Sequence, residues 1–170
     1  MSTCLVIIDV QRGFVSERTK DVPERIKQLA KLRPFDHIVA TRFMNREGSP
    51  YQKFMGWRGL MDDNSQEIYP VVAGLPEQVF PKFIYSCFTD EFVSFMHQQH
   101  IDKLFFVGID TDCCVLKSAS DCFEKNIDFE VITDCCGSNG GFDSHQAALT
   151  VMRRMVGKKV LVESGVVVNE

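Results

Sequence analysis

Short apolar runs alternate with amphipathic segments along the whole chain. Six runs, whose apolar residues do not alternate with polar ones, predict strands covered on both faces. These runs lie at residues 5–9, 37–41, 78–82, 103–108, 129–132 and 159–162. Helical spacing predicts helices at residues 23–31, 91–99, 114–126 and 143–155. This order predicts an α/β fold: a three-layer α/β/α arrangement around a mostly parallel six-stranded sheet, Rossmann-like in type.

Residues 44–75 interrupt the alternation, and their scattered glycines and prolines predict a long functional or interfacial loop. Nothing in the chain has the composition of a linker, repeat or low-complexity tract. With 170 residues, 45% of them hydrophobic, we expect a single domain over residues 1–170. Apolar stretches at residues 51–57 and 166–168 favour interfaces, so we expect a homo-oligomer.

Charge and cysteine usage narrow the functional classes. The net charge of −4 comes from interspersed residues without a basic stripe, so no nucleic-acid partner is expected. The first apolar run has no basic segment before it and stops at Asp9, so we expect neither a signal peptide nor a membrane span there. This favours a cytoplasmic location. Seven cysteines without a C-x-x-C motif indicate reduced thiols rather than a disulfide framework or a zinc site.

Three residues whose side chains are suited to catalysis lie at the ends of predicted strands. Asp9 ends the first strand, Lys82 ends the third, and Cys114 follows the fourth at the start of a helix. In open parallel sheets, ligands bind beyond the carboxyl ends of the strands where strand order reverses, commonly between the first and fourth. A helix N-terminus also lowers a thiol's pKa and can hold an oxyanion, so we expect an available thiolate at Cys114. Taken alone, such a cysteine is more often a buried structural residue.

Three segments resemble the isochorismatase-like cysteine hydrolases, whose relatives include nicotinamidases and N-carbamoyl amide hydrolases. Residues 5–14 look like the family's first strand, with its aspartate, a Val-Gln pair and a following aromatic. Residues 82–88 are similar to the family's Lys-x-x-Tyr-Ser-Ala-Phe segment. Residues 108–115 look like its Gly-x-x-Thr-Asp-x-Cys-Val signature. The segments occur in the family's order, and the resemblance extends over most of the chain.

The resemblance implies a catalytic triad of Asp9, Lys82 and Cys114, with Cys114 rather than Cys113 as the nucleophile. It implies hydrolysis of a C–N bond in a small amide or N-carbamoyl compound through a thioester acyl-enzyme. The groups themselves suit these roles, since Asp9 can relay protons and Lys82 can hold the carboxylate and sulfur in register. The backbone N–H groups of Asp110 and Cys114 would form the oxyanion hole, with a cis peptide bond between Ile109 and Asp110.

Further residues receive weaker assignments. We expect a substrate pocket formed by five residues: Phe14, Phe43, Trp57, Tyr85 and Cys113. We expect Gln11 to lie behind this pocket and to hold its side chains in position. Asp110 replaces the small residue usual in relatives, and its charge would favour neutral or cationic substrates.

The sequence also departs from the metal-dependent relatives. Nicotinamidases carry metal-binding aspartate and histidine residues after the second strand, whereas residues 40–46 here contain no Asp-x-His motif. We therefore predict no metal and no cofactor. One alternative stays open, a non-hydrolytic member of the same fold that acts in thiol redox chemistry or binding through Cys113 and Cys114.

Overall fold

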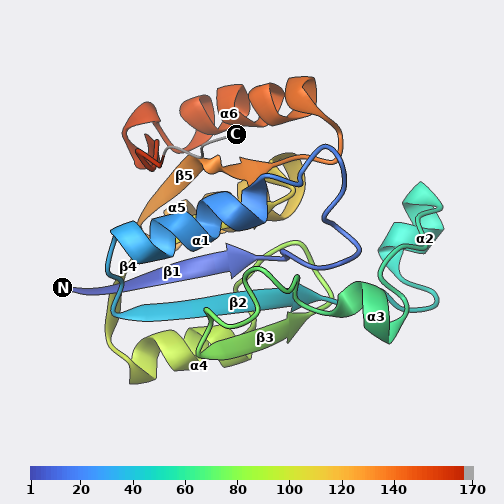
Figure 1. The fold of residues 1–170 in the computed structure, drawn as a ribbon, viewed down its shortest axis with the longest axis horizontal. Helices are drawn as coiled ribbons and strands as arrows, with labels where there is room; N and C mark the ends of the chain where they lie inside the picture. Colours follow the sequence, from blue (N-terminus) through green and yellow to red (C-terminus); the bar gives the residue numbers. More distant parts are fainter. Residues whose placement is uncertain (167–170) are drawn as a thin grey trace.

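A single parallel sheet forms the centre of the structure, a computed structural model that describes residues 1–166 (Figure 1). Its strands follow the order β3-β2-β1-β4-β5-β6, and every neighbouring pair is parallel. The strands are β1 (Ser2–Ile8), β2 (His37–Phe43), β3 (Gln78–Lys82), β4 (Ile101–Ile109), β5 (Asp128–Gly137) and β6 (Leu161–Val162). The predicted α/β class and six-stranded sheet are confirmed, and the sheet is parallel throughout.

Both faces of the sheet are covered, which explains the uninterrupted apolar runs. Side chains alternate along β1: Val6 and Ile8 enter one core cluster, while Leu5 and Ile7 enter the other. Residues of α4 (Asp90–Gln98), α5 (Leu116–Glu124) and α6 (Phe142–Met155) complete the first cluster. Helix α1 (Val22–Leu32) and the segment before β3 complete the second. The central strands therefore have no solvent-facing side that would require polar residues.

Helix boundaries agree with expectation except after β4. The segment expected to begin a helix at Cys114 instead forms a π-helical turn, Thr111–Val115, and α5 starts only at Leu116. Cys114 therefore lies inside a wide helical turn. The expected strand at residues 159–162 is wrong in its first half, because Lys158–Val160 form a 3-10 turn before β6. None of the described helices has the length and apolar character needed to cross a bilayer.

The middle segment is more ordered than the expected loop, since it contains α2 (Pro50–Met55) and α3 (Asp63–Gln66). In Figure 1 both helices lie beyond the arrowheads of the central strands. The first is capped at both ends: the Ser49 side chain accepts from the N–H of Gln52, and Gly56 adopts a left-handed φ of 66°. Phe54 on this helix is 77% exposed, as an interface would require, but assembly stays a prediction. Val167 and Val168 of the second expected interface lie outside the described residues.

Strand order reverses between β1 and β4, and the two strands approach each other closely at their carboxyl ends. Gly108 near the end of β4 has a φ of 128°, and a Cβ atom there would lie 2.1 Å from the carbonyl oxygen of Ile8. Only glycine fits such a position, because any side chain would collide with the neighbouring backbone. Residues that follow β1 and β4 are thereby brought together at the switch point of the sheet.

Candidate active site

Asp9, Lys82 and Cys114 meet at the switch point. Asp9 directly follows β1 and has a φ of 50°, a conformation that non-glycine residues adopt mainly where surrounding structure enforces it. Nζ of Lys82, the last residue of β3, lies 2.7 Å from Oδ2 of Asp9 and 3.5 Å from Sγ of Cys114. The three residues are 0%, 1% and 4% exposed, respectively. The structure therefore joins three residues far apart in sequence into one buried cluster.

Backbone and hydroxyl groups fix the charged pair in place. Nζ of Lys82 donates to the carbonyl oxygens of Ile84 and Tyr85, at 2.9 and 3.1 Å. The hydroxyl of Thr41 donates to Oδ1 of Asp9 at 2.7 Å. Among the described residues, the Lys82 ammonium is the one cation in contact with Oδ2 of Asp9. Oδ2 remains able to accept a proton.

Burial dominates the electrostatics of the sulfur. It raises the pKa of the Cys114 thiol well above its ordinary value; the Asp9 carboxylate adds to the rise, and the Lys82 ammonium only partly opposes it. The expected lowered pKa is therefore wrong, because the sequence arguments omitted complete desolvation. For Lys82, burial disfavours the charged form, but Asp9 and Cys114 outweigh it and hold the pKa above its ordinary value. The resting site is best described as a neutral thiol beside a carboxylate–ammonium pair.

The turn after β4 sets the backbone conformation around Cys114. The peptide bond between Ile109 and Asp110 is cis. The N–H groups of Cys113 and Val115 both donate to the carbonyl of Asp110, each at 3.2 Å. Among the described residues, the N–H of Cys114 finds no backbone partner outside this turn. A π-helical turn leaves such donors at its start, where an anion can use them.

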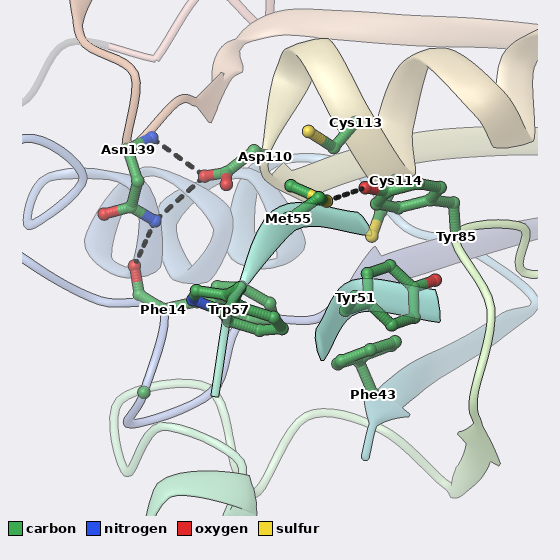
Figure 2. Close-up of a pocket in the computed structure, with 11 residues that line it drawn as sticks. Phe14, Phe43, Tyr51, Met55, Trp57, Tyr85, Asp110, Cys113, Cys114 and Asn139 are labelled. Carbon is green, nitrogen blue, oxygen red and sulfur yellow. Dashed lines mark hydrogen bonds between the residues drawn. The ribbon is translucent and has the colours of Figure 1, made fainter. Parts of the chain in front are cut away.

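A cavity of about 220 Å³ opens beside Cys114 (Figure 2). Figure 2 shows Cys114 and Asp110 on one side and the rings of Phe43, Tyr51 and Trp57 on the other. All of the expected pocket residues line it: Phe14, Phe43, Trp57, Tyr85 and Cys113. The structure adds Gly13, Tyr51, Met55 and Asn139. The lining is mainly aromatic, which suits a small and largely apolar ligand.

Comparison with known proteins identifies the family. The model of the isochorismatase domain matches residues 3–164. The chain belongs to the isochorismatase family. Two curated relatives, isochorismatase family proteins 1A and 1B of Dictyostelium discoideum, are 34% identical over 68 residues, which are 39% of this chain. The matched segment covers 33% of each of those proteins, so the chain spans about a third of their length.

Solved structures of other isochorismatase-type proteins share the fold along nearly their whole lengths. An isochorismatase-like hydrolase from Alkaliphilus metalliredigens has a TM-score of 0.83 at 15% identity, covering 96% of both chains. N-carbamoylsarcosine amidase from Thermoplasma acidophilum has a TM-score of 0.81 at 17% identity, covering 99% of this chain and 100% of that one. The pyrazinamidase/nicotinamidase of Streptococcus mutans has a TM-score of 0.79 at 21% identity, covering 95% and 100%.

Gln11 stands behind the pocket of this isochorismatase-family protein. Its Nε2 donates to the carbonyls of Phe43 and Gln66 at 2.8 and 2.9 Å, and its Oε1 accepts from the N–H of Phe43 at 2.8 Å. The side chain is fully buried. Gln11 therefore ties a pocket-lining aromatic of β2 to the last residue of α3, consistent with the positioning role expected for it.

Asn139, in the turn after β5, is the polar pocket residue that the sequence did not single out. Its backbone N–H and Nδ2 both donate to Oδ1 of Asp110, at 2.8 and 2.9 Å, and Nδ2 also donates to the carbonyl of Phe14. In the sequence it stands in a Ser-Asn-Gly-Gly stretch, which indicates a turn but not what the side chain contacts. Asn139 thus clamps Asp110 to the segment that follows β1.

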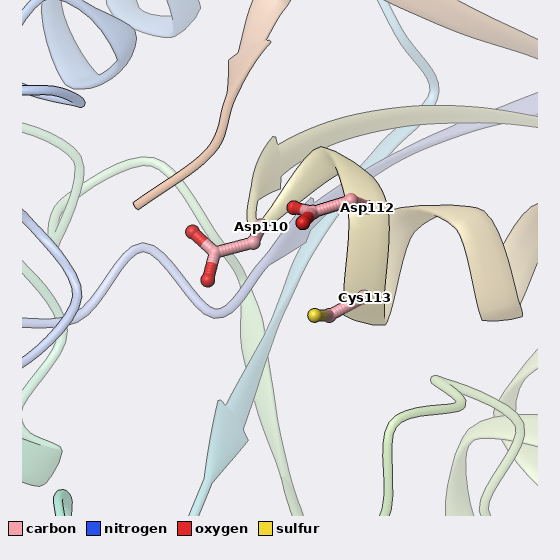
Figure 3. Close-up of side chains that lie close together, drawn as sticks. All are labelled: Asp110, Asp112 and Cys113. Carbon is pink, nitrogen blue, oxygen red and sulfur yellow. The ribbon is translucent and has the colours of Figure 1, made fainter. Parts of the chain in front are cut away.

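The residues present do not fit the metal site of nicotinamidases. After β2, Asn45 donates from Nδ2 to the carbonyls of Trp57 and Gly59, and its Oδ1 accepts from Ser49, so its polar atoms are occupied. Elsewhere, ligand atoms of Asp110, Asp112 and Cys113 lie within 4.8 Å of one another (Figure 3). Ser138 donates to Oδ1 of Asp112 and Asn139 to Oδ1 of Asp110, so one oxygen of each carboxylate has a protein partner.

Proposed function

We propose that this protein is a metal-independent amidohydrolase that cleaves the C–N bond of a small amide or N-carbamoyl compound through a thioester on Cys114. The observation that carries the proposal is the buried contact of Asp9, Lys82 and Cys114 beside an aromatic cavity. Amidases among the proteins that share this fold, N-carbamoylsarcosine amidase and the nicotinamidases, support the reaction class. Membership in the isochorismatase family supports it as well.

Acylation begins from the neutral thiol. As Sγ of Cys114 forms a bond to the carbonyl carbon, its proton passes to Oδ2 of Asp9, the carboxylate oxygen that the Lys82 ammonium contacts. The raised pKa of the thiol makes this transfer necessary, because little thiolate exists beforehand. The carbonyl electron pair moves onto oxygen, where the N–H groups of Cys114 and Asp110 would stabilise it. When the C–N bond breaks, the leaving nitrogen takes the proton from Asp9 and a thioester remains.

Deacylation uses the same groups with water. Asp9 accepts a proton from water as the water oxygen attacks the thioester carbonyl, and Asp9 returns the proton to sulfur when the C–S bond breaks. Lys82 keeps its charge throughout, because the pair it forms with Asp9 and the two carbonyls at its Nζ favour the ammonium. Its role is to hold the carboxylate and sulfur within proton-transfer distance and to balance their charge in a buried site.

The thiol-redox alternative has less support. Burial and the neighbouring carboxylates of Asp112 and Asp110 raise the pKa of Cys113 to about 12, and the pKa of Cys114 is raised as well. Thiol–disulfide exchange requires a thiolate, and redox-sensing cysteines have lowered pKa values. Neither sulfur has this property, whereas hydrolysis needs only a base at the moment of attack, which Asp9 provides.

The decisive test is hydrolysis by the purified protein and its Cys114→Ala variant. A panel of small carboxamides and N-carbamoyl compounds would be assayed for released ammonia, and intact-protein mass spectrometry would look for the acyl adduct. We expect turnover and a transient adduct only when Cys114 is present, with Cys113→Ala retaining the adduct as the matched control. Turnover that survives in Cys114→Ala would refute the mechanism, and no turnover of any compound would refute the function.

A further inference from the structure

Asp110 is the one charged side chain that lines the cavity among the described residues. The other lining groups are aromatic rings, the Met55 thioether, two thiols, Gly13 and the amide of Asn139. No lysine, arginine or histidine lines the cavity in the described part of the chain. A substrate carboxylate would therefore meet no counter-ion and one like charge, whereas a substrate cation would meet a carboxylate. Among the described residues, the charge of the cavity lining comes from Asp110, while the Asp9–Lys82 ion pair beside Cys114 carries no net charge.

The position of this carboxylate leaves one oxygen for a ligand. Asn139 donates two hydrogen bonds to Oδ1 of Asp110, at 2.8 and 2.9 Å, and fixes the orientation of the group. Oδ2 accepts no hydrogen bond from the described residues, and it is not fully buried. Because Asp110 lines the cavity, Oδ2 is an oriented acceptor without a protein partner among the described residues. A carboxylate held in this way recognises a donor without the entropic cost of ordering a free side chain.

The aromatic wall favours the same kind of ligand. Phe14 and Trp57 stack with centroids 6.0 Å apart and planes inclined by 13°, and Phe43 and Tyr51 meet edge to face at 5.0 Å. The faces of aromatic rings attract cations, most strongly where water is excluded. Asp112, close to Asp110 (Figure 3), adds negative charge without lining the cavity. Aromatic faces and an oriented carboxylate together are a recognition set for an ammonium group.

We propose that Asp110 is a specificity-determining residue and that the site takes small amides bearing a positively charged amino group, which Oδ2 binds. This inference rests on the proposed amide hydrolysis and names its substrate class. Asp110 then has two separate roles, with its backbone N–H at the reacting carbonyl and its side chain at the substituent. Burial raises its pKa to about 6, so the carboxylate is ionised at pH 7 and above. Amides that carry a carboxylate are rejected.

Binding in the absence of turnover tests this proposal separately from the reaction. The protein with Cys114→Ala would be titrated calorimetrically at pH 7.5 with three benzamides of matched size, carrying an aminomethyl, a methyl or a carboxylate group at the meta position. We expect the ammonium compound to bind about tenfold tighter than the neutral one, the range of a charge-assisted hydrogen bond. The carboxylate compound should bind weakest. Fluorescence of Trp57, the chain's one tryptophan, gives an independent readout inside the cavity.

Substitution then assigns the preference to one side chain. Adding Asp110→Asn to the Cys114→Ala protein should reduce the ratio of affinities for the ammonium and neutral compounds to about twofold or less. Asp110→Ala is a second variant, for the case in which asparagine is not tolerated at this position. Asp112→Asn removes one carboxylate charge that lies outside the cavity, and this variant should keep most of the preference for the ammonium compound. Equal affinities in the parent, no binding of any compound, or an advantage that survives both Asp110 variants would overturn the proposal. Selective binding without hydrolysis by the Cys114-containing protein would instead overturn the proposed function alone.

Discussion

Replacing Lys82 with methionine tests whether the buried charges of the site depend on one another. Met fills nearly the same volume but removes the ammonium that lies 2.7 Å from Oδ2 of Asp9. It also removes the donor to the carbonyls of Ile84 and Tyr85. The Asp9 carboxylate, 0% exposed, would keep only the hydroxyl of Thr41 as a partner at its oxygens among the described residues. An unpaired buried charge of this kind is strongly destabilising.

The expected magnitude follows from burial. Removing one member of a buried ion pair costs about 3–5 kcal/mol of folding free energy. For a chain of 170 residues, this corresponds to a melting temperature lower by roughly 6–20 °C. The pKa of Lys82 is raised above its ordinary value of 10.5, so its contribution is fully present below that pH and is lost as the pH rises through the folded value. The difference between wild type and Lys82→Met should therefore narrow in strong alkali.

Urea unfolding at pH 7.5 would measure the free energy of unfolding for wild type and four variants: Lys82→Met, Asp9→Asn, their double variant and Lys103→Met. Lys103→Met is the matched control, because Lys103 contacts Glu130 at the same 2.7 Å but both side chains are more than 20% exposed. That pair should contribute no more than about 1 kcal/mol. In the double variant Lys82→Met/Asp9→Asn the unpaired charge is gone, so the loss should be smaller than the sum of the two single losses by about 2 kcal/mol or more. Equal losses for Lys82→Met and Lys103→Met, or strict additivity in the double variant, would refute the reasoning.

Four further outcomes are expected. The pKa of Asp110 is raised, so its ionised form destabilises the folded state above about pH 6 but not below about pH 3.8. Asp110→Asn should therefore be more stable than wild type by about 1–2 kcal/mol at pH 8 and no more stable near pH 3.8. An equal difference in urea unfolding at both pH values would contradict this. Gln11→Ala should cost about 2–3 kcal/mol and raise KM, because Phe43 loses two hydrogen bonds; unchanged stability and KM would count against its positioning role. Iodoacetamide should label Cys114 slowly at pH 7 and faster up to pH 9, measured by peptide mass spectrometry, because its thiol pKa is raised; a rate already constant near pH 7 would indicate an ordinary activated thiolate. Light scattering should give a multiple of 19.3 kDa, because α2 exposes Phe54 and Met55; a monomer would exclude the expected assembly.

The parts of the fold that the sequence predicted are those set by local pattern. Apolar runs predicted the strands of a sheet covered on both faces, and the runs that end at Asp9 and Lys82 marked the ends of their strands, whereas β2 continues past Thr41 to Phe43. The order of strands and helices then placed Cys114 opposite Asp9. The first half of the last strand was wrong, because Lys158–Val160 adopt a 3-10 turn that apolar content alone does not distinguish.

What the sequence left out depends on packing between distant segments. The pKa of Cys114 was predicted in the wrong direction, because its burial comes from residues on several elements and no local spacing reports it. Helix α2 did leave a signal, with Ser49 and Pro50 at its start and Gly56 at its end, which is the usual pattern of a short capped helix. No sequence pattern indicated the role of Asn139, because an asparagine in a turn has the same kind of local sequence whether or not its side chain holds a carboxylate.

Lys82 differs from its partners in the kind of strand that carries it. Asp9 and Cys114 follow β1 and β4, each paired on both sides, whereas β3 is an edge strand of five residues that includes Pro81, which has no N–H to donate. Edge segments open at lower free energy than the centre of a sheet. Mild heating would therefore release the ammonium while the strands that precede the base and the nucleophile are still paired. The enzyme proposed here would lose activity reversibly at temperatures where hydrogen exchange still finds its central strands protected.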